Sequence, residues 1–292
     1  MLVNYEHKFA FCPIQKSGSS IWTQLFLRMN GDQHWYEPPW HKQLPTMRGL
    51  PKEEIERIMN DPTWTKAIMF RDPAMRLLSA YFYTIKKKSQ INAYRDALRR
   101  ATKNSSTSWD HFLMAVTKMN HQNLHWRPQV DFCRFEKFYP LFNFVGNLER
   151  SALHGPMLLK QAGVWDQYGT REWALTKVLE TARGANPSAS RYKFKLPEGY
   201  NQSDCMFCDI FSAHKNDYNA QNHGRVRHSF NNTGKGHHNS TSARAQYMTS
   251  EAWQRIRNSD FYKKDYATLN RITASPFDKD LYFSYPPPMR RK

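Results

Sequence analysis

Residues 8–22 read "KFAFCPIQKSGSSIW" and combine a short apolar run, a lysine inside a Gly/Ser turn and the start of an amphipathic stretch. Apolar residues recur at helical spacing from Ile21 to Met29, so the stretch predicts a strand, a tight turn and a helix. The start of a helix offers unpaired backbone N–H groups and the positive end of its dipole, which favour an anion. Lys16 adds a charge, and Gly18 lets the backbone approach a ligand closely. The turn is therefore a candidate anion-binding loop.

This turn differs from the nucleotide P-loop G-x-x-x-x-G-K-[ST]. Here Lys16 precedes Gly18, and no glycine stands four or five residues upstream. An ordinary strand-to-helix turn is the alternative for this stretch taken alone.

The composition is that of a basic globular protein. The chain has 292 residues, of which 40% are hydrophobic, so it can bury a sizeable core. Its 43 Lys and Arg residues against 25 Asp and Glu residues give a net charge of +18, which favours anionic glycans, membranes, nucleic acids or phosphorylated cofactors as partners. No nucleic-acid-binding signature is present, so no nucleic acid is expected. No stretch approaches the roughly 18 apolar residues of a membrane span, and a membrane contact is expected only through a segment absent from this chain.

Two further apolar runs are candidate strands. "KAIMF" (66–70) leads into "RDPAMRLLSAY" (71–81), where Asp72 and Pro73 are suited to begin a helix, and "FNFVG" (142–146) is the other run. Strands alternating with helices predict an α/β fold, which we expect as a P-loop-like three-layer sandwich around a central parallel sheet.

The remaining segments complete the expected organisation. A helix is expected near residues 249–266, an irregular excursion over about 184–245 and a solvated basic tail over 275–292. We expect the whole chain, residues 1–292, to form a single domain.

The second strand-to-helix junction carries another candidate phosphate site. Arg71 ends the predicted strand, and Ser79 lies about two turns into the helix, so a guanidinium and a hydroxyl could converge on one phosphate. The alternative is that Arg71 and Asp72 cap the helix while Ser79 only packs.

Together the two motifs resemble the sulfotransferases that use 3′-phosphoadenosine 5′-phosphosulfate (PAPS), most closely the Golgi carbohydrate enzymes of the chondroitin 4-O and HNK-1 type. "HWRPQVDFC…FNFVGNLE" (125–149) and "YMTSEAWQRIRNSDFYKKDYATLN" (247–270) resemble further blocks of that group. The resemblance implies sulfuryl transfer to a glycan hydroxyl, with a glycan acceptor that we expect to be anionic. It also implies the Golgi lumen, with a soluble cytoplasmic protein as the alternative.

The resemblance assigns the donor-binding residues. Arg71 and Ser79 would hold the 3′-phosphate. The first loop would hold the 5′-phosphosulfate through Lys16, Ser17, Gly18, Ser19, Ser20, Ile21 and Trp22.

The chemistry requires a cation and a base. Lys16 would place its charge on the leaving oxygen, and a histidine would take the proton of the acceptor hydroxyl. By the same resemblance His41 is the expected base, with His125 as the alternative base or a substrate-orienting residue and Glu37 as a further candidate. Trp126 offers a face on which a sugar ring could stack, or it is a core tryptophan.

Other features are less decisive. The four cysteines allow three fully paired connectivities, and "CMFC" (205–208) is only half of a zinc site, so no metal is expected. Four N-x-[ST] sequons are compatible with a glycoprotein.

Departures from the family pattern are Gln15, where a proline is common, and Phe135, where a second cysteine would fall. A kinase acting on a small molecule and a non-catalytic polyanion-binding module are the rival functions.

Overall fold

The computed structural model describes residues 1–35, 44–83, 99–100, 103, 106–118, 123–170, 173 and 247–274. These residues divide into two compact units. The first contains Met1–Pro13, Ser19–Ile68 and the described residues from Leu141 to Trp173, and the second contains Ile14–Gly18, Met69–Pro140 and residues 247–274. The excursion over 184–245 and the tail over 275–292 lie outside the described residues. The single-domain expectation stays a prediction.

The first unit is built on a four-stranded sheet in the order β1-β2-β3-β4. The strands are β1 (Leu2–Asn4), β2 (Phe9–Cys12), β3 (Thr65–Phe70, whose last two residues belong to the second unit) and β4 (Phe144–Asn147). The three predicted strands are confirmed. β2 pairs in parallel with β3, but β1 runs antiparallel to β2, so the sheet is mixed and the expectation of a parallel sheet is corrected at this edge.

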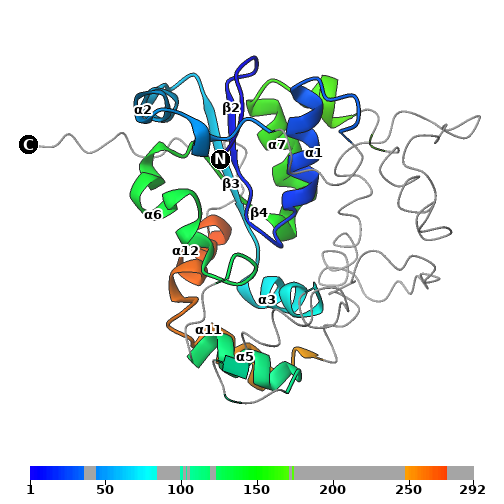
Figure 1. Ribbon diagram of the computed structural model, residues 1–292, viewed down its shortest axis with the longest axis vertical. Coiled ribbons are helices and arrows are strands. Elements are labelled where there is room, and N and C mark those ends of the chain that lie inside the picture. Colours follow the sequence, from blue (N-terminus) through cyan, green and yellow to red (C-terminus); the bar gives the residue numbers. More distant parts are fainter. Residues whose placement is uncertain are drawn as a thin grey trace, which may run out of the picture. The chain divides into compact units, whose positions relative to one another are not determined.

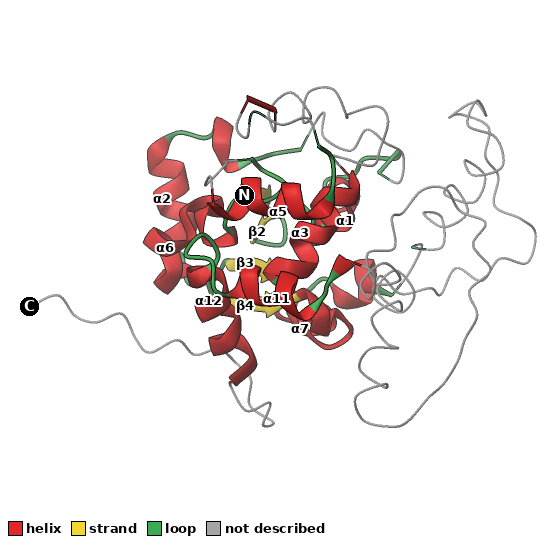
Figure 2. Ribbon diagram, turned by 90° about the horizontal axis from the view of Figure 1, so that it is seen from below, coloured by secondary structure: helices red, strands yellow, loops and turns green. Residues whose placement is uncertain are grey.

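Helices cover both sides of these strands. In Figures 1 and 2, α1 (Ser19–Met29) and α7 (Ser151–Gln161) lie on one side, and α2 (Lys52–Asn60) lies on the other. Aromatic side chains join α1 to β2, because the rings of Phe11 and Trp22 stack at 4.2 Å and those of Phe9 and Phe26 lie 4.9 Å apart. The arrangement is α/β, and the finer P-loop-like description stays a prediction.

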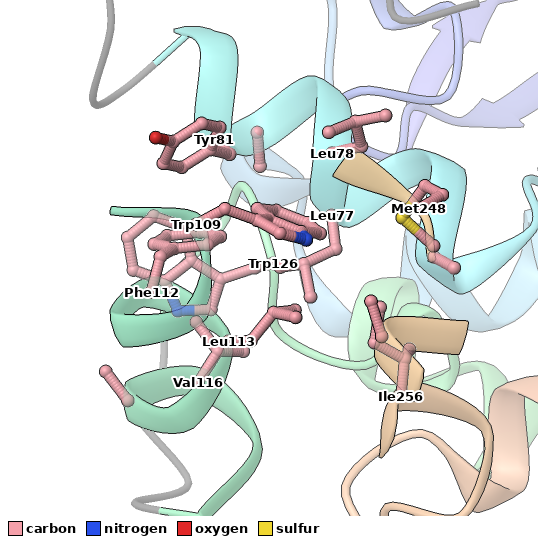
Figure 3. Close-up of a cluster of buried hydrophobic side chains, with 14 of the residues drawn as sticks. Leu77, Leu78, Tyr81, Trp109, Phe112, Leu113, Val116, Trp126, Met248 and Ile256 are labelled. Carbon is pink, nitrogen blue, oxygen red and sulfur yellow. The ribbon is translucent and has the colours of Figure 1, made fainter. Parts of the chain in front are cut away.

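The second unit has a mainly helical core. Leucines and a tyrosine of α3 (Pro73–Tyr81) pack against α5 (Trp109–Lys118), Trp126 and α11 (Ser250–Arg257), as Figure 3 shows. α3 begins as predicted, because the Asp72 carboxylate accepts the Met75 N–H at 2.9 Å and Pro73 occupies the first helical position.

The helix expected over 249–266 is two helices. α11 ends at Arg257, and α12 covers Lys263–Ala274. The chain turns between them, where the Ser259 N–H donates to the Ile256 carbonyl at 3.2 Å and Tyr262 is buried. Burial of Tyr262 is a tertiary effect, so helical periodicity alone did not reveal the break.

Short helical segments complete the described structure. They are η1 (Met47–Gly49), η3 (Gln129–Arg134), α6 (Phe135–Phe138), η4 (Tyr139–Leu141), η5 (Leu148–Arg150) and the π-helical η6 (Trp165–Gly169). Within the described part of the chain, no helix has both the length and the apolar character needed to cross a bilayer.

Candidate active site

The lysine turn has an uncommon backbone conformation. The Ser17 N–H donates to the Ile14 carbonyl at 3.1 Å and closes the turn. Lys16 and Gly18 have φ angles of 66° and 75°, in the left-handed region. Glycine adopts this conformation readily, but a lysine loses roughly 1–2 kcal/mol in it. Such strain is retained where the surroundings fix the backbone, and it concentrates at functional sites.

The Lys16 side chain lies in an aromatic setting. Its Nζ is 3.8 Å from the ring centroid of Tyr83, and the rings of Tyr83 and His125 have centroids 4.9 Å apart. The structure therefore gathers the expected lysine and one of the two candidate histidines around one tyrosine.

The environment of His125 keeps its imidazole neutral. Burial, followed by the charges of Lys16 and Arg76, lowers the pKa of His125 to about 4. A neutral imidazole can accept a hydrogen bond at neutral pH, but a group with this pKa is a weak base.

Arg71 lies directly after β3 and is only 7% exposed. Its Nη1 donates to the backbone carbonyl of Lys16 at 2.9 Å. The structure thus brings together the predicted arginine and the predicted lysine, which are 55 residues apart in the sequence. Two cationic side chains so placed can bind an anionic ligand such as a phosphate.

Arg76 is a buried residue of α3 that connects the segments around Lys16 and His125. Its Nε donates to the Gln15 carbonyl at 2.8 Å, and its Nη1 and Nη2 donate to the carbonyls of Arg127 and Leu124 at 2.7 and 3.1 Å. Burial lowers the pKa of Arg76 to about 10, so the guanidinium remains charged at neutral pH.

Sequence reasoning assigned no function to Arg76. The available signal was a charged residue inside the otherwise apolar helix "PAMRLLSAY".

Gln129 also contacts this region and was missed. Its Oε1 accepts from the Ser17 hydroxyl at 3.2 Å, and the buried Asp265 carboxylate accepts its backbone N–H at 2.8 Å. A neutral glutamine and a single aspartate gave no pattern by which the sequence could reveal them.

The other predicted donor-loop residues differ in how exposed their side chains are. Ser17 is buried. Ser19 and Ser20 are the first two residues of α1, where Ser19 is half-buried and Ser20 is exposed. Ile21 and Trp22 point their side chains into the core, so a role in donor binding would fall to their backbone N–H groups. On α3, Ser79 is half-buried. Joint binding of one phosphate by Ser79 and Arg71 stays a prediction.

The predicted acceptor-site residues have mixed outcomes. Trp126 is 1% exposed and packs in the helical core, where its ring lies 5.3 Å from that of Phe112 and its carbonyl accepts the Tyr262 hydroxyl at 2.6 Å. This placement favours the core alternative for Trp126 over sugar stacking. His41 and Glu37 lie outside the described residues.

The described residues include two of the four cysteines, and they also bear on metal binding. Cys12 and Cys133 are both disulfide-bonded. "CMFC" lies outside the described residues, among which no cluster of His, Cys, Asp and Glu could hold a metal ion.

An α/β fold, a strained lysine turn that leads into a helix and an arginine bonded to that turn are typical of a protein that binds a phosphate-bearing ligand. The sequence model described as "Sulfotransferase family" matches residues 1–203, and the chain belongs to this family.

Two curated proteins are similar to the chain. Carbohydrate sulfotransferase 9 of Homo sapiens is 26% identical over 171 residues, which cover 50% of this chain and 37% of that protein. Carbohydrate sulfotransferase 14 of Danio rerio is 25% identical over 184 residues, which cover 56% of this chain and 48% of that protein. The chain therefore matches less than half the length of these relatives. No solved structure matches it.

Proposed function

We propose that this protein transfers a sulfuryl group from PAPS to a hydroxyl of a glycan, which we expect to be anionic. One observation carries the proposal: the strained turn that presents Lys16 is hydrogen-bonded through its carbonyl to the Arg71 guanidinium at 2.9 Å. Membership of the sulfotransferase family and similarity to two carbohydrate sulfotransferases support it.

The residues of the turn fit the donor. The cationic side chain of Lys16, the hydroxyl of Ser17 and the N–H groups from Gly18 through Ser20 would hold the 5′ end, while Arg71 and Ser79 would hold the 3′-phosphate. When bound, PAPS supplies the sulfuryl group, and 3′-phosphoadenosine 5′-phosphate (PAP) is the product that remains.

The protein's own groups would act by charge and proton transfer. The Lys16 ammonium would stabilise the negative charge that develops on the leaving oxygen, a contribution that preorganised groups make effectively. A base would take the proton of the acceptor hydroxyl as its oxygen attacks.

The low pKa of His125 supports an orienting role for it, as an acceptor for the glycan hydroxyl. His41 then stays the preferred candidate for the base.

The cysteines support the location that the resemblance implies. Disulfide bonds persist in oxidising compartments, and Cys12 and Cys133 are both disulfide-bonded. We therefore assign the protein to the Golgi lumen within this proposal.

The decisive experiment is calorimetry with PAP, AMP, ATP and heparin in parallel, without Mg²⁺ for every ligand and with Mg²⁺ in a second titration of ATP. We expect micromolar binding of PAP and at least tenfold weaker binding of AMP, which lacks the 3′-phosphate, a difference of about 1.4 kcal/mol or more. Preference for ATP in the presence of Mg²⁺ would indicate a kinase instead, and binding of heparin alone would indicate a polyanion-binding module. Transfer of labelled sulfate to desulfated glycans then identifies the acceptor.

A further inference from the structure

Gln129 occupies a central position between the lysine turn and Arg71. Its side chain is 0% exposed. The Oε1 atom accepts the Arg71 backbone N–H at 2.8 Å and the Ser17 hydroxyl at 3.2 Å. The Nε2 atom donates to the Arg71 carbonyl at 2.7 Å and to an Asp265 carboxylate oxygen at 3.3 Å. One amide therefore bonds to both segments that carry the candidate donor-binding residues.

These four contacts fix the orientation of the amide. Both partners of Oε1 are donors and both partners of Nε2 are acceptors, so each atom of the Gln129 amide meets complementary groups. Rotating the amide by half a turn would place its NH₂ against the Arg71 N–H and its oxygen against a carbonyl. A buried polar group that loses its hydrogen-bond partners destabilises the fold, so the observed orientation is strongly preferred.

Asp265 holds the backbone of Gln129 in place. Asp265 lies in the first turn of α12 and is 0% exposed. Each of its carboxylate oxygens accepts the Gln129 backbone N–H at 2.8 Å, and one of them also accepts the Val130 N–H at 3.1 Å. These N–H groups belong to the first two residues of η3, where no preceding turn of helix supplies acceptors. The carboxylate of one helix thus caps the start of another, across 136 residues of sequence.

We propose that Asp265 and Gln129 are positioning residues for the sulfuryl donor: Asp265 fixes Gln129, and Gln129 fixes Ser17 and Arg71. The inference rests on the proposed function and assigns a role in donor binding to α12. Asp265 lies beyond residues 1–203, the part that matches the family model. The role therefore comes from this chain's own contacts.

The split between kcat and KM distinguishes positioning from a general structural role. A variant that is partly unfolded has fewer active molecules, which lowers the apparent kcat and leaves the KM of the remaining molecules unchanged. A variant with displaced Ser17 and Arg71 contacts binds the donor more weakly, which raises the KM for PAPS and the Kd for PAP.

The experiment compares Asp265→Asn and Gln129→Leu with a matched control, Tyr262→Phe. Tyr262 is equally buried and lies three residues before Asp265, but its hydroxyl bonds to the Trp126 carbonyl. In the whole 292-residue chain, PAP binding is measured by calorimetry, and sulfation kinetics are measured with PAPS as the varied substrate.

We expect both site variants to weaken PAP binding and raise the PAPS KM about tenfold, the equivalent of one lost contact of about 1.4 kcal/mol, while Tyr262→Phe stays within about twofold. We expect the double variant to bind PAP about as tightly as the more affected of the two single variants, because both substitutions break one connected set of hydrogen bonds. Asp265→Asn preserves the size of the side chain and keeps the test decisive if Gln129→Leu does not fold.

Unchanged PAP affinity in both site variants, or equal weakening in Tyr262→Phe, overturns the positioning role and leaves the proposed function intact. Failure of the wild-type protein to bind PAP overturns the proposed function and, with it, this inference.

Discussion

Lys16 combines a strained backbone with a charge at the candidate site. Its φ is 66°, and its ammonium lies 3.8 Å from the centroid of the Tyr83 ring. If this charge stabilises the leaving oxygen, Lys16→Ala will lower turnover by at least about a hundredfold, since one preorganised group contributes roughly 3–4 kcal/mol. PAP affinity should change much less, because the charge on that oxygen develops mainly during transfer. Initial rates and PAP calorimetry measure the two effects.

Lys16→Gly is the matched variant for the role of strain. Glycine accepts the left-handed φ, so Lys16→Gly should exceed Lys16→Ala in stability by about 1 kcal/mol while losing turnover to the same extent. Such a result would separate the backbone strain at residue 16 from the role of the Lys16 ammonium in turnover. Turnover within tenfold of the wild type in both variants would exclude Lys16 from the chemistry.

At the scale of single elements, α7 provides a pH-sensitive contact outside the candidate site. The Nδ1 of His154 accepts the Asn147 N–H at 2.8 Å, and the side chain is 3% exposed. Burial, followed by the charge of Arg150, lowers the pKa of His154 to about 4. The folded state thus prefers the neutral imidazole. Its contribution is complete above the unfolded pKa of about 6.5 and is lost as the pH falls toward 4.

His154→Gln should therefore make the protein less sensitive to acid. The amide stays neutral, so we expect the free energy of unfolding to fall by about 2 kcal/mol less between pH 7 and pH 5 than in the wild type. Urea unfolding at the two pH values measures the difference.

The remaining titrating groups do not obscure this comparison. Burial raises the pKa of Asp265 to about 6, which acts in the opposite direction, but Asp265 is common to both proteins. Leu153→Gln, at an exposed position of α7, is the control and should retain the wild-type pH dependence, because it removes no titrating group. Parallel pH dependences of the wild type and His154→Gln would exclude this contribution.

Elements with local signals were predictable from the sequence. The Asp72–Pro73 pair marks the start of α3 without help from other segments, and the apolar run before the lysine turn marks β2. By contrast, β1 has only three residues, and its pairing of Leu2 with Phe11 is a tertiary contact without sequence periodicity. A local sequence pattern predicts a helix or strand only where residues close in sequence stabilise that element.

The residues of the candidate site also differ in whether a local sequence pattern points to them. Lys16 and Arg71 were candidates from the sequence because each is a charged residue between a predicted strand and a predicted helix; the structure brings them into contact, and their roles stay predictions. Gln129 and Asp265 were not candidates, because their importance depends on buried bonds across 58 to 136 residues of sequence. Trp126 has the residue type of a sugar platform, and only packing shows that its faces are covered.

At the scale of the whole molecule, the net charge of +18 bears on acceptor binding. A field of this sign attracts an anionic glycan from a distance, and dissolved salt screens it over about 8–10 Å at 0.10–0.15 M. The effect belongs to the summed charge, so no single lysine or arginine should account for it. The chemical step depends on groups in contact with the substrates and should respond little to salt.

We therefore expect the KM for an anionic glycan acceptor to rise on the order of tenfold between 50 and 300 mM NaCl, with kcat at saturating acceptor constant within about twofold. PAPS must be kept saturating, because the donor is itself anionic and its own KM will rise with salt. The matched control is a desulfated, neutral acceptor of the same length, whose KM should change far less. If both acceptors respond alike, the salt acts on the donor or on the fold. A salt-independent KM for the anionic acceptor would instead mean that the excess charge serves something other than acceptor capture.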